Sequence, residues 1–463
     1  MRYKEERSLF IDRMIDDVHR MPIQNVIGQR INLKQNGRHY MGLCPFHRDT
    51  RLGSFIVTPD KGMWKCFTCG DGYGGEAIRF AALYDDVPWI EAAFRVALEN
   101  GIITQAEHDK YNRGISKSES LRLEKKHEVR EEQRPRQKKA PRDVVERTYL
   151  AMKELSPLKK EHREHLSQVR KLPEARINAD YFTFPNYDKP GMAKKIMEKA
   201  GVSMDDLIHV PGFFFDKKKG APTYMGSRGI GILIRDPASH VCAVQIRRDA
   251  VTEGQSRYHW FSSTFAANEP DKYEGGCGCG SAKDVLYPTG ARQLPSLCIT
   301  EGRFKSEVIA RNGSTSISLQ GVSSWKGIES EIRQVMERRP IKNILIMFDA
   351  DMTTNKAVFD QTVGLSQMLQ RAFPKAQTVY ALWPKDSGKG IDDLVLAGRG
   401  SEMRIRAVGQ VQGAYGRVYA DLLGERGAKT IRDVKDVDEF RGALQRSLES
   451  ALLGSHVHPV NMN

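Results

Sequence analysis

The chain has 463 residues, of which 40% are hydrophobic, and 72 Lys and Arg against 58 Asp and Glu give it a net charge of +14. No stretch approaches the length of a membrane span, which excludes an integral membrane protein, and the positive charge favours a polyanionic partner. The N-terminal run MRYKEERSLFIDRM lacks the apolar core of a secretory leader, and the seven cysteines are an odd number. These features predict a soluble, cytoplasmic protein of several domains in a reduced compartment.

Residues 1–112 are predicted to form one compact module. The run over 22–43 starts at helical spacing and passes into strand-like alternation. Strands are expected at SFIV and MWKCF, and apolar residues recur at helical spacing over 74–100.

Four residues of this module have the spacing of a zinc site. Cys44 and His47 read C-x2-H, and after eighteen residues Cys66 and Cys69 read C-x2-C. Two such pairs close a tetrahedral zinc site with no position left for a substrate, so the predicted zinc is structural. Buried structural cysteines or a disulfide are the alternatives, and the gathering of these residues in one short window favours zinc.

The chain turns polar over 113–145, with both charges mixed and few large apolar residues. We interpret it as a linker, and a phosphate-contacting role for its basic cluster is the alternative to a solvated spacer. Residues 146–293 mix helix and strand, and GIGILIRD and HVCAVQIRRDAV are predicted to pair around a turn at 237–239. For the Gly-rich run over 275–283, a tight turn is favoured over metal binding by Cys277 and Cys279.

Strands and helices alternate over 294–398. Strands are expected at PSLCIT, STSISLQG, KNILIMFDAD and QTVYALW, with helices between them, which predicts a parallel sheet covered by helices. Residues 399–463 are expected to be mainly helical. The predicted fold class is α/β multidomain: a small zinc-binding β-rich domain, a linker, an α+β basic subdomain, a parallel α/β domain and a helical C-terminus.

Acidic residues follow three of these predicted strands. Glu301 comes just after the first, Asp349 and Asp351 lie at the end of the third, and Asp392 and Asp393 come after the last. The carboxyl ends of parallel strands lie at one edge of a sheet, so the acids are expected to converge there. Such oxygen ligands suit Mg²⁺ or Mn²⁺ and phosphoryl transfer. Ordinary helix capping is the alternative, and the ordered set on successive strands favours a metal site.

The two features together resemble DnaG-type primases, the phage and plasmid forms in particular. CPFH, the SF of GSF, and KCFTCG are similar to the CHC2 zinc-binding domain, and 294–398 is similar to the TOPRIM catalytic fold. GSRGIGILIRD, QIRRD and SRYHWFSS resemble the basic subdomain that precedes TOPRIM. The resemblance implies an enzyme that makes RNA primers from nucleoside triphosphates on single-stranded DNA, with structural Zn²⁺ and catalytic Mg²⁺ or Mn²⁺.

The resemblance also implies roles for individual residues. The family's metal-binding acids fall on Glu301, Asp349, Asp351 and Asp392, of which the first three are the expected catalytic residues. Basic residues that would hold phosphates or template fall near Arg228, Arg247 and Arg248, and a surface ion pair is the alternative for each. This chain departs from the bacterial pattern by having Lys305 and Gly390 in place of two acids. Lys305 is hypothesised to contact a phosphate.

The zinc module is expected to read the template, because basic residues alternate with aromatic ones along it. Lys61 and Trp64 are the predicted DNA contacts, and Phe55 is the predicted core residue. The chain has no P-loop motif, so a replicative helicase would be a separate partner, contacted through the C-terminal 60 residues.

Two rival functions remain open. One is another TOPRIM enzyme. A topoisomerase would need a further domain with a nucleophilic tyrosine, for which little of this chain is left, and a nuclease of this type usually comes with an ATPase, whose motif this sequence lacks. The other is a non-catalytic single-stranded DNA-binding protein with a primase-like fold, which the departures at Lys305 and Gly390 keep open.

Overall fold

The structure is a computed structural model that describes residues 2–454 apart from 47, 48, 50, 51, 70–72, 113–119, 121, 125–137, 253–255, 281 and 355. The chain falls into two compact units, Met1–Arg136 with Thr252–Ser256 and Gln137–Val251 with Arg257–Asn463, and each has its own hydrophobic core. Most of the predicted linker lies outside the described residues. Among the described helices, none combines the length and the apolar character that crossing a membrane requires.

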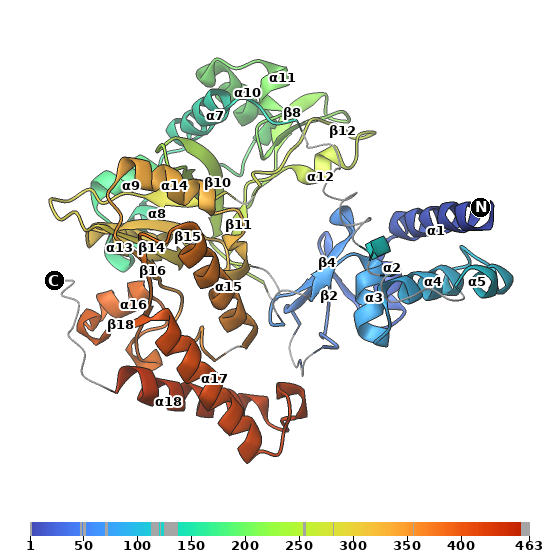
Figure 1. Ribbon diagram of the computed structural model, residues 1–463. Helices are drawn as coiled ribbons and strands as arrows, with labels where there is room; N and C mark the ends of the chain where they lie inside the picture. Colours follow the sequence, from blue (N-terminus) through green and yellow to red (C-terminus); the bar gives the residue numbers. More distant parts are fainter. Residues whose placement is uncertain are drawn as a thin grey trace. The chain divides into compact units, whose positions relative to one another are not determined.

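The first unit combines a small antiparallel sheet with helices (Figure 1). Its helices are α1 (Arg2–Arg20), α2 (Ile23–Gly28), α3 (Ala77–Asp85), α4 (Trp89–Glu99) and α5 (Gln105–Tyr111). Its strands pair in chain order: β1 (Lys34–Asn36), β2 (His39–Gly42), β3 (Phe55–Thr58), β4 (Met63–Cys66) and β5 (Gly74–Gly75). The strands at SFIV and MWKCF are confirmed, whereas α1 and α5 lie outside the predicted elements.

An aromatic cluster forms the core of this unit, as expected for a small module with few large side chains to bury. The rings of Phe55 and Trp64 stack with centroids 5.1 Å apart, and Phe80 meets them edge-on at 5.7 and 5.3 Å. Trp64 Nε1 donates to the backbone oxygen of Glu76 over 3.2 Å, and the Glu76 carboxylate caps the first turn of α3. These contacts fix β4, and therefore Cys66 at its end.

The N-terminal part of the second unit contains two antiparallel sheets and several helices. One sheet has the order β11 (Tyr258–Trp260), β10 (Val241–Arg248), β9 (Gly229–Arg235) and β6 (Tyr181–Thr183), and the other has the order β12 (Tyr273–Glu274), β7 (Phe213–Asp216) and β8 (Ala221–Tyr224). The helices are α7 (Arg142–Leu155), α8 (Lys160–Glu164), α9 (Glu174–Asp180), α10 (Lys189–Ala200), α11 (Met204–Leu207) and α12 (Thr264–Ala267), and a π-helical turn, η2 (His165–Val169), follows α8.

The predicted pairing of β9 and β10 is confirmed, and the turn between them contains Ser239 with a left-handed φ of 69°. In the Gly-rich run, Gly275 and Gly276 have left-handed φ of 72° and 85°, which favour glycine, but residues 275–280 form no hydrogen-bonded turn. The tight turn predicted there is therefore not confirmed.

The C-terminal part is built on a six-stranded sheet with the order β13 (Asp284–Leu286), β15 (Thr315–Leu319), β14 (Ser296–Glu301), β16 (Asn343–Ile346), β17 (Gln377–Leu382) and β18 (Arg404–Ala407). The four central strands are parallel, as predicted, and the edge strands β13 and β18 are antiparallel and lie outside 294–398.

Helices cover both faces of this sheet, as its apolar clusters show. Helices α13 (Arg303–Arg311) and α16 (Ile391–Leu396) share a core with one face. Helices α14 (Glu329–Arg338), α15 (Lys356–Ala372) and α17 (Val408–Glu425) share the core of the other, and α18 (Val437–Leu453) packs beside α17 (Figure 1).

Candidate functional site

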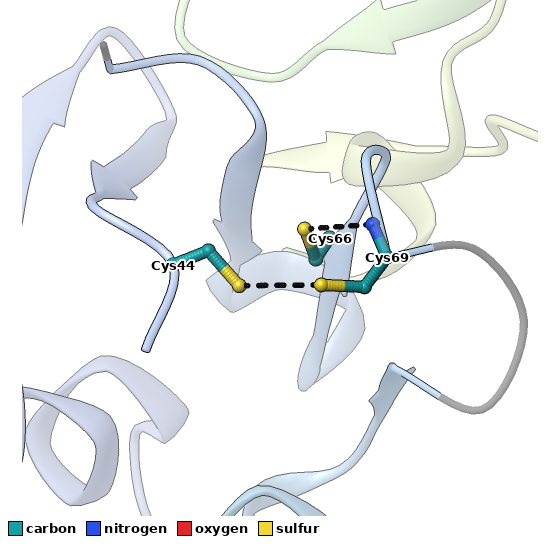
Figure 2. Close-up of side chains that lie close together, drawn as sticks. All are labelled: Cys44, Cys66 and Cys69. Atoms are coloured by element: carbon teal, nitrogen blue, oxygen red, sulfur yellow. Dashed lines mark hydrogen bonds between the residues drawn. The ribbon is translucent and has the colours of Figure 1, made fainter. Parts of the chain in front are cut away.

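Three of the four predicted zinc ligands come together in the first unit (Figure 2). Cys44 lies in the loop after β2, Cys66 ends β4, and Cys69 lies in the turn that follows. Their sulfur atoms all lie within 4.8 Å of one another, and Cys44 Sγ is 3.7 Å from Cys69 Sγ. Tetrahedral ligands about 2.3 Å from zinc lie ~3.8 Å apart, so this spacing fits a zinc ion.

The surroundings of the sulfurs also suit a structural ion. The backbone N–H of Cys69 donates to Cys66 Sγ over 3.3 Å, and the Asp49 carboxylate accepts from the N–H of Cys44 over 3.0 Å. Contact with Cys44 and then Cys66 raises the pKa of the Cys69 thiol, because nothing but a cation would stabilise several thiolates so close together. The fourth predicted ligand, His47, lies outside the described residues and stays a prediction.

The prediction that Trp64 contacts DNA is wrong. Trp64 is 1% exposed, because successive side chains of a strand alternate between faces and Trp64 and Cys66 both face the core. Phe67, directly after β4, is 60% exposed, and Lys65 Nζ lies 5.6 Å from its ring centroid. Lys61 is exposed, as a DNA contact would have to be. Phe67 therefore replaces Trp64 as the candidate aromatic contact.

The predicted acids meet at one edge of the six-stranded sheet. Glu301 is the last residue of β14, Asp349 and Asp351 follow β16, and Asp392 lies in the first turn of α16, after β17. The chain leaves β14 for β15 on one side and continues with β16 on the other. The ends of β14 and β16 thus flank the switch point at which open α/β sheets bind ligands. We call these four residues the carboxylate cluster.

The oxygen donors of the carboxylate cluster suit Mg²⁺ or Mn²⁺, but three of them do not lie close enough together to bind one shared ion. Among the described residues, only the three cysteines form a group of three or more metal-ligating side chains within 4.8 Å. Asp349 carries a lysine on each oxygen, with Lys305 Nζ in contact with Oδ1 and Lys389 Nζ 3.6 Å from Oδ2. Within the described part of the chain, Glu301 and Asp351 have no ion pair, so their carboxylates are the ones left for a divalent cation.

Burial and repulsion between carboxylates raise the pKa of two members of the carboxylate cluster. Burial, and then the charge of Asp349, raises the pKa of Glu301 to about 7, while Lys305 acts in the opposite direction. Burial and the charge of Asp393 also raise the pKa of Asp392. Additional positive charge would stabilise the ionised form of both carboxylates.

One cationic side chain that was not predicted, Arg170, lies beside the acids. Arg170, directly after η2, has its Nη1 3.2 Å from Oδ2 of Asp392. Burial and the charges of Arg247 and Arg170 lower the pKa of His165 to about 4, so both charges lie within electrostatic reach of its ring. One nitrogen of each, Arg170 Nε, Arg247 Nε and His165 Nε2, is buried without a hydrogen-bond partner in the described residues. The rest of each guanidinium can donate hydrogen bonds, and phosphate oxygens would suit the two arginines.

The three predicted arginines do not gather at one place. Arg247 and Arg248 are adjacent in β10 and therefore point to opposite faces of its sheet. Arg247 lies opposite Tyr258, and Arg170 and Arg247 both act on the pKa of Tyr258, which burial raises. Arg228 is exposed just before β9. Of the three, Arg247 is the one that the structure places beside Arg170.

Two family models match the chain. Residues 10–112 match the CHC2 zinc finger, and residues 291–402 match a domain of unknown function, DUF3854. The first match contains all four predicted zinc ligands, so this module is a CHC2 zinc finger. The second covers the carboxylate cluster and names no activity, so the TOPRIM assignment and the catalytic roles stay predictions.

Curated DNA primases are similar to part of the chain. The primase of Geobacillus stearothermophilus is 41% identical over 101 residues, which is 22% of this chain and 15% of the relative. The primase of Aquifex aeolicus is 43% identical over 88 residues, 19% of this chain and 17% of the relative. The matched segment thus spans less than a fifth of either relative. The predicted resemblance to DnaG-type primases is confirmed over this segment.

Solved primase structures also align with the chain. The Aquifex aeolicus primase, with its zinc-binding and RNA polymerase domains, aligns over 94% of this chain and 96% of its own, at 18% identity and a TM-score of 0.41.

Proposed function

We propose that the chain is a DNA primase, which joins ribonucleotides into short primers on a single-stranded DNA template. The observation that carries the proposal is the presence, in one chain, of a CHC2 zinc finger like that of DNA primases and of a strand-end carboxylate cluster beside half-buried arginines. A zinc finger alone fits many nucleic-acid-binding proteins, and an acidic cluster alone fits many phosphoryl-transfer enzymes. The pair supplies both template binding and nucleotidyl transfer.

The acids and the arginines have different roles in nucleotidyl transfer. A bound 3′-hydroxyl attacks the α-phosphate of an incoming nucleoside triphosphate, and pyrophosphate leaves. Mg²⁺ or Mn²⁺ held through Glu301 and Asp351, with Asp349 beside them, would stabilise the negative charge that develops on that phosphate. Arg170 and Arg247 bind the triphosphate oxygens, since guanidinium groups donate two hydrogen bonds to such groups at once.

The ion pair of Asp392 favours a different role from that of the metal ligand that the resemblance implied. Its carboxylate is paired with Arg170 across 3.2 Å. We propose that it orients this arginine toward the triphosphate. Metal binding by Asp392 remains the alternative, and it would require the ion pair to open.

The zinc finger binds the template in this proposal. Phe67 offers an exposed ring on which a base can stack. Lys65 lies on β4, which ends just before Phe67, and Lys61 ends the short helical turn that precedes β4. A base stacked on Phe67 would bring the DNA backbone near these lysines. Zinc holds Cys66 and Cys69 on either side of Phe67 and so fixes the position of the ring.

Several broader predictions belong to the same proposal. A replicative helicase on a separate chain is a candidate partner, the cytoplasm is the expected location, and a phage or plasmid origin is expected from the resemblance. A topoisomerase or nuclease and a non-catalytic DNA-binding protein remain the rival functions.

One assay separates these functions. The full chain is incubated with single-stranded DNA templates, labelled nucleoside triphosphates and Mg²⁺ or Mn²⁺. Short RNA products are expected, and Asp349→Ala should abolish them, whereas Asp360→Ala, which removes an exposed carboxylate of α15, should not. Cleavage or relaxation of DNA would indicate a rival enzyme, and DNA binding without products would indicate a binding protein.

A further inference from the structure

Lys305 places a positive charge inside the carboxylate cluster. It lies in the first turn of α13, directly after β14, and its side chain is 18% exposed. Its Nζ contacts Asp349. Burial raises the pKa of Glu301 and of Asp392, and the Lys305 charge acts against that rise in both. One ammonium group thus lies within electrostatic reach of acids from three neighbouring strand ends.

Gly390 leaves the space that this lysine fills. A Cβ atom at position 390 would lie 2.5 Å from Lys305 Cε and 2.5 Å from Oδ1 of Asp392. The backbone φ of Gly390 is −107°, which any residue adopts, so the backbone does not require glycine there. A side chain at position 390 would therefore displace the end of the Lys305 side chain and the Asp392 carboxylate. Positions 305 and 390 are sterically coupled, and glycine at 390 leaves the space that the Lys305 side chain occupies.

The ion pairs at the carboxylate cluster leave two carboxylates available to bind a divalent ion. Asp349 has a lysine at each oxygen, and Asp392 has an arginine partner. Within the residues that the structure describes, Glu301 and Asp351 are the members of the carboxylate cluster without an ion pair. Two carboxylates with water and phosphate oxygens suffice for Mg²⁺, which usually keeps several waters.

We propose that Lys305 takes the place of one divalent cation in the carboxylate cluster, so that the site binds a single divalent ion through Glu301 and Asp351. An ammonium group supplies charge without demanding six ligands in octahedral geometry. Part of the positive charge at the site is then independent of the metal concentration. The catalytic meaning of the remaining ion rests on the proposed function, but the number of ions does not.

Counting bound Mn²⁺ tests the proposal. Zinc-loaded, full-length protein is titrated with Mn²⁺, and free Mn²⁺ is followed by electron paramagnetic resonance. The wild type should bind one Mn²⁺ at the cluster, and Glu301→Gln should lose it. Lys305→Met, which keeps the shape and removes the charge, should bind a second ion or bind the first at least tenfold more tightly. Lys389→Met is the matched control, because Lys389 contacts the same carboxylate but is 70% exposed, and it should leave the count unchanged.

Two equivalent Mn²⁺ ions in the wild type, or unchanged binding in Lys305→Met, would overturn the proposal. The double variant Lys305→Asp with Gly390→Asp gives a second measurement and should bind two ions. Neither count depends on primer synthesis, so a protein that binds one Mn²⁺ but makes no primers would contradict the proposed function alone.

The steric pairing has its own test. Gly390→Ala should lower the melting temperature of the wild type, and should lower it less in a Lys305→Ala background, where one of the two colliding side chains is gone. Equal losses in both backgrounds would show that positions 305 and 390 are independent, and would contradict the pairing.

Discussion

Arg303 donates from Nη1 to Oδ2 of Asp284 over 3.1 Å in the interior of the second unit, where each residue is 2% exposed. The ion pair joins the start of α13 to the edge strand β13. Asp180 and Glu307 also accept from the same guanidinium, and Arg235 shares Asp180. Arg303 lies two residues after Glu301 and two before Lys305, so this buried network fixes the helix that positions the carboxylate cluster.

Removing the central cation of this network should destabilise the second unit strongly. Arg303→Met leaves several buried carboxylates without a partner, and the free energy of unfolding should fall by about 3–5 kcal/mol. Urea denaturation followed by circular dichroism measures the loss. The control is Arg311→Met, at the exposed end of the same helix, whose guanidinium contacts only a backbone oxygen in the described residues. That change should cost less than about 1 kcal/mol, and equal losses would mean that the network adds nothing.

The stability of the second unit should fall in mild acid because of His259. Burial, together with the charge of Arg248, lowers the pKa of His259 from 6.5 to about 4. Between these values the unfolded chain binds a proton that the folded chain does not, so stability is lost as the pH falls. Between pH 7.5 and pH 5 His259 alone should contribute a loss of about 2 kcal/mol. His259→Gln should have a flatter pH dependence in urea denaturation, and slopes equal to that of the wild type would contradict this prediction.

The sequence predicted the carboxylate cluster well because its members are local features of single strands. Each acid follows an apolar run, and parallel strands bring their carboxyl ends to one edge whatever the details of packing. Arg170 could not be found in this way. It is 222 positions from Asp392, and nothing in its surrounding run HLSQVRK indicates which element it will face.

Trp64 shows a different kind of error, because the signal was present in the sequence. The choice of Trp64 relied on the neighbouring lysines, but neighbours in a strand point to opposite faces, and a core-facing Cys66 two positions on also puts Trp64 in the core. Helix α1 was missed in the same way. Its residues Ile11, Met14 and Val18 are buried at helical spacing, yet the charged residues between them dominate the composition.

Phe67 should contribute to template binding, whereas other exposed apolar residues of its unit should not. Phe67→Ala removes a ring on which a base can stack, so affinity for single-stranded DNA should fall by about 1–3 kcal/mol, roughly 5- to 150-fold. Fluorescence anisotropy with a labelled oligonucleotide at fixed salt measures the change. Leu9→Ala, which truncates a side chain that is 71% exposed on α1, is the control and should bind DNA like the wild type. An unchanged affinity for Phe67→Ala would remove this residue from the template surface.

The alternation of β10 predicts opposite outcomes for two adjacent arginines. Arg247 lies beside Arg170 and has a buried Nε without a hydrogen-bond partner in the described residues, whereas Arg248 points to the other face of the sheet. Arg247→Ala should raise the KM for nucleoside triphosphates at least tenfold, because a charge-assisted hydrogen bond to phosphate contributes about 1.5–3 kcal/mol. Arg248→Ala should change that KM less than about threefold. Primer synthesis over a range of nucleotide concentrations measures both, and a larger effect of Arg248→Ala would place the triphosphate on the opposite face of β10, away from the carboxylate cluster.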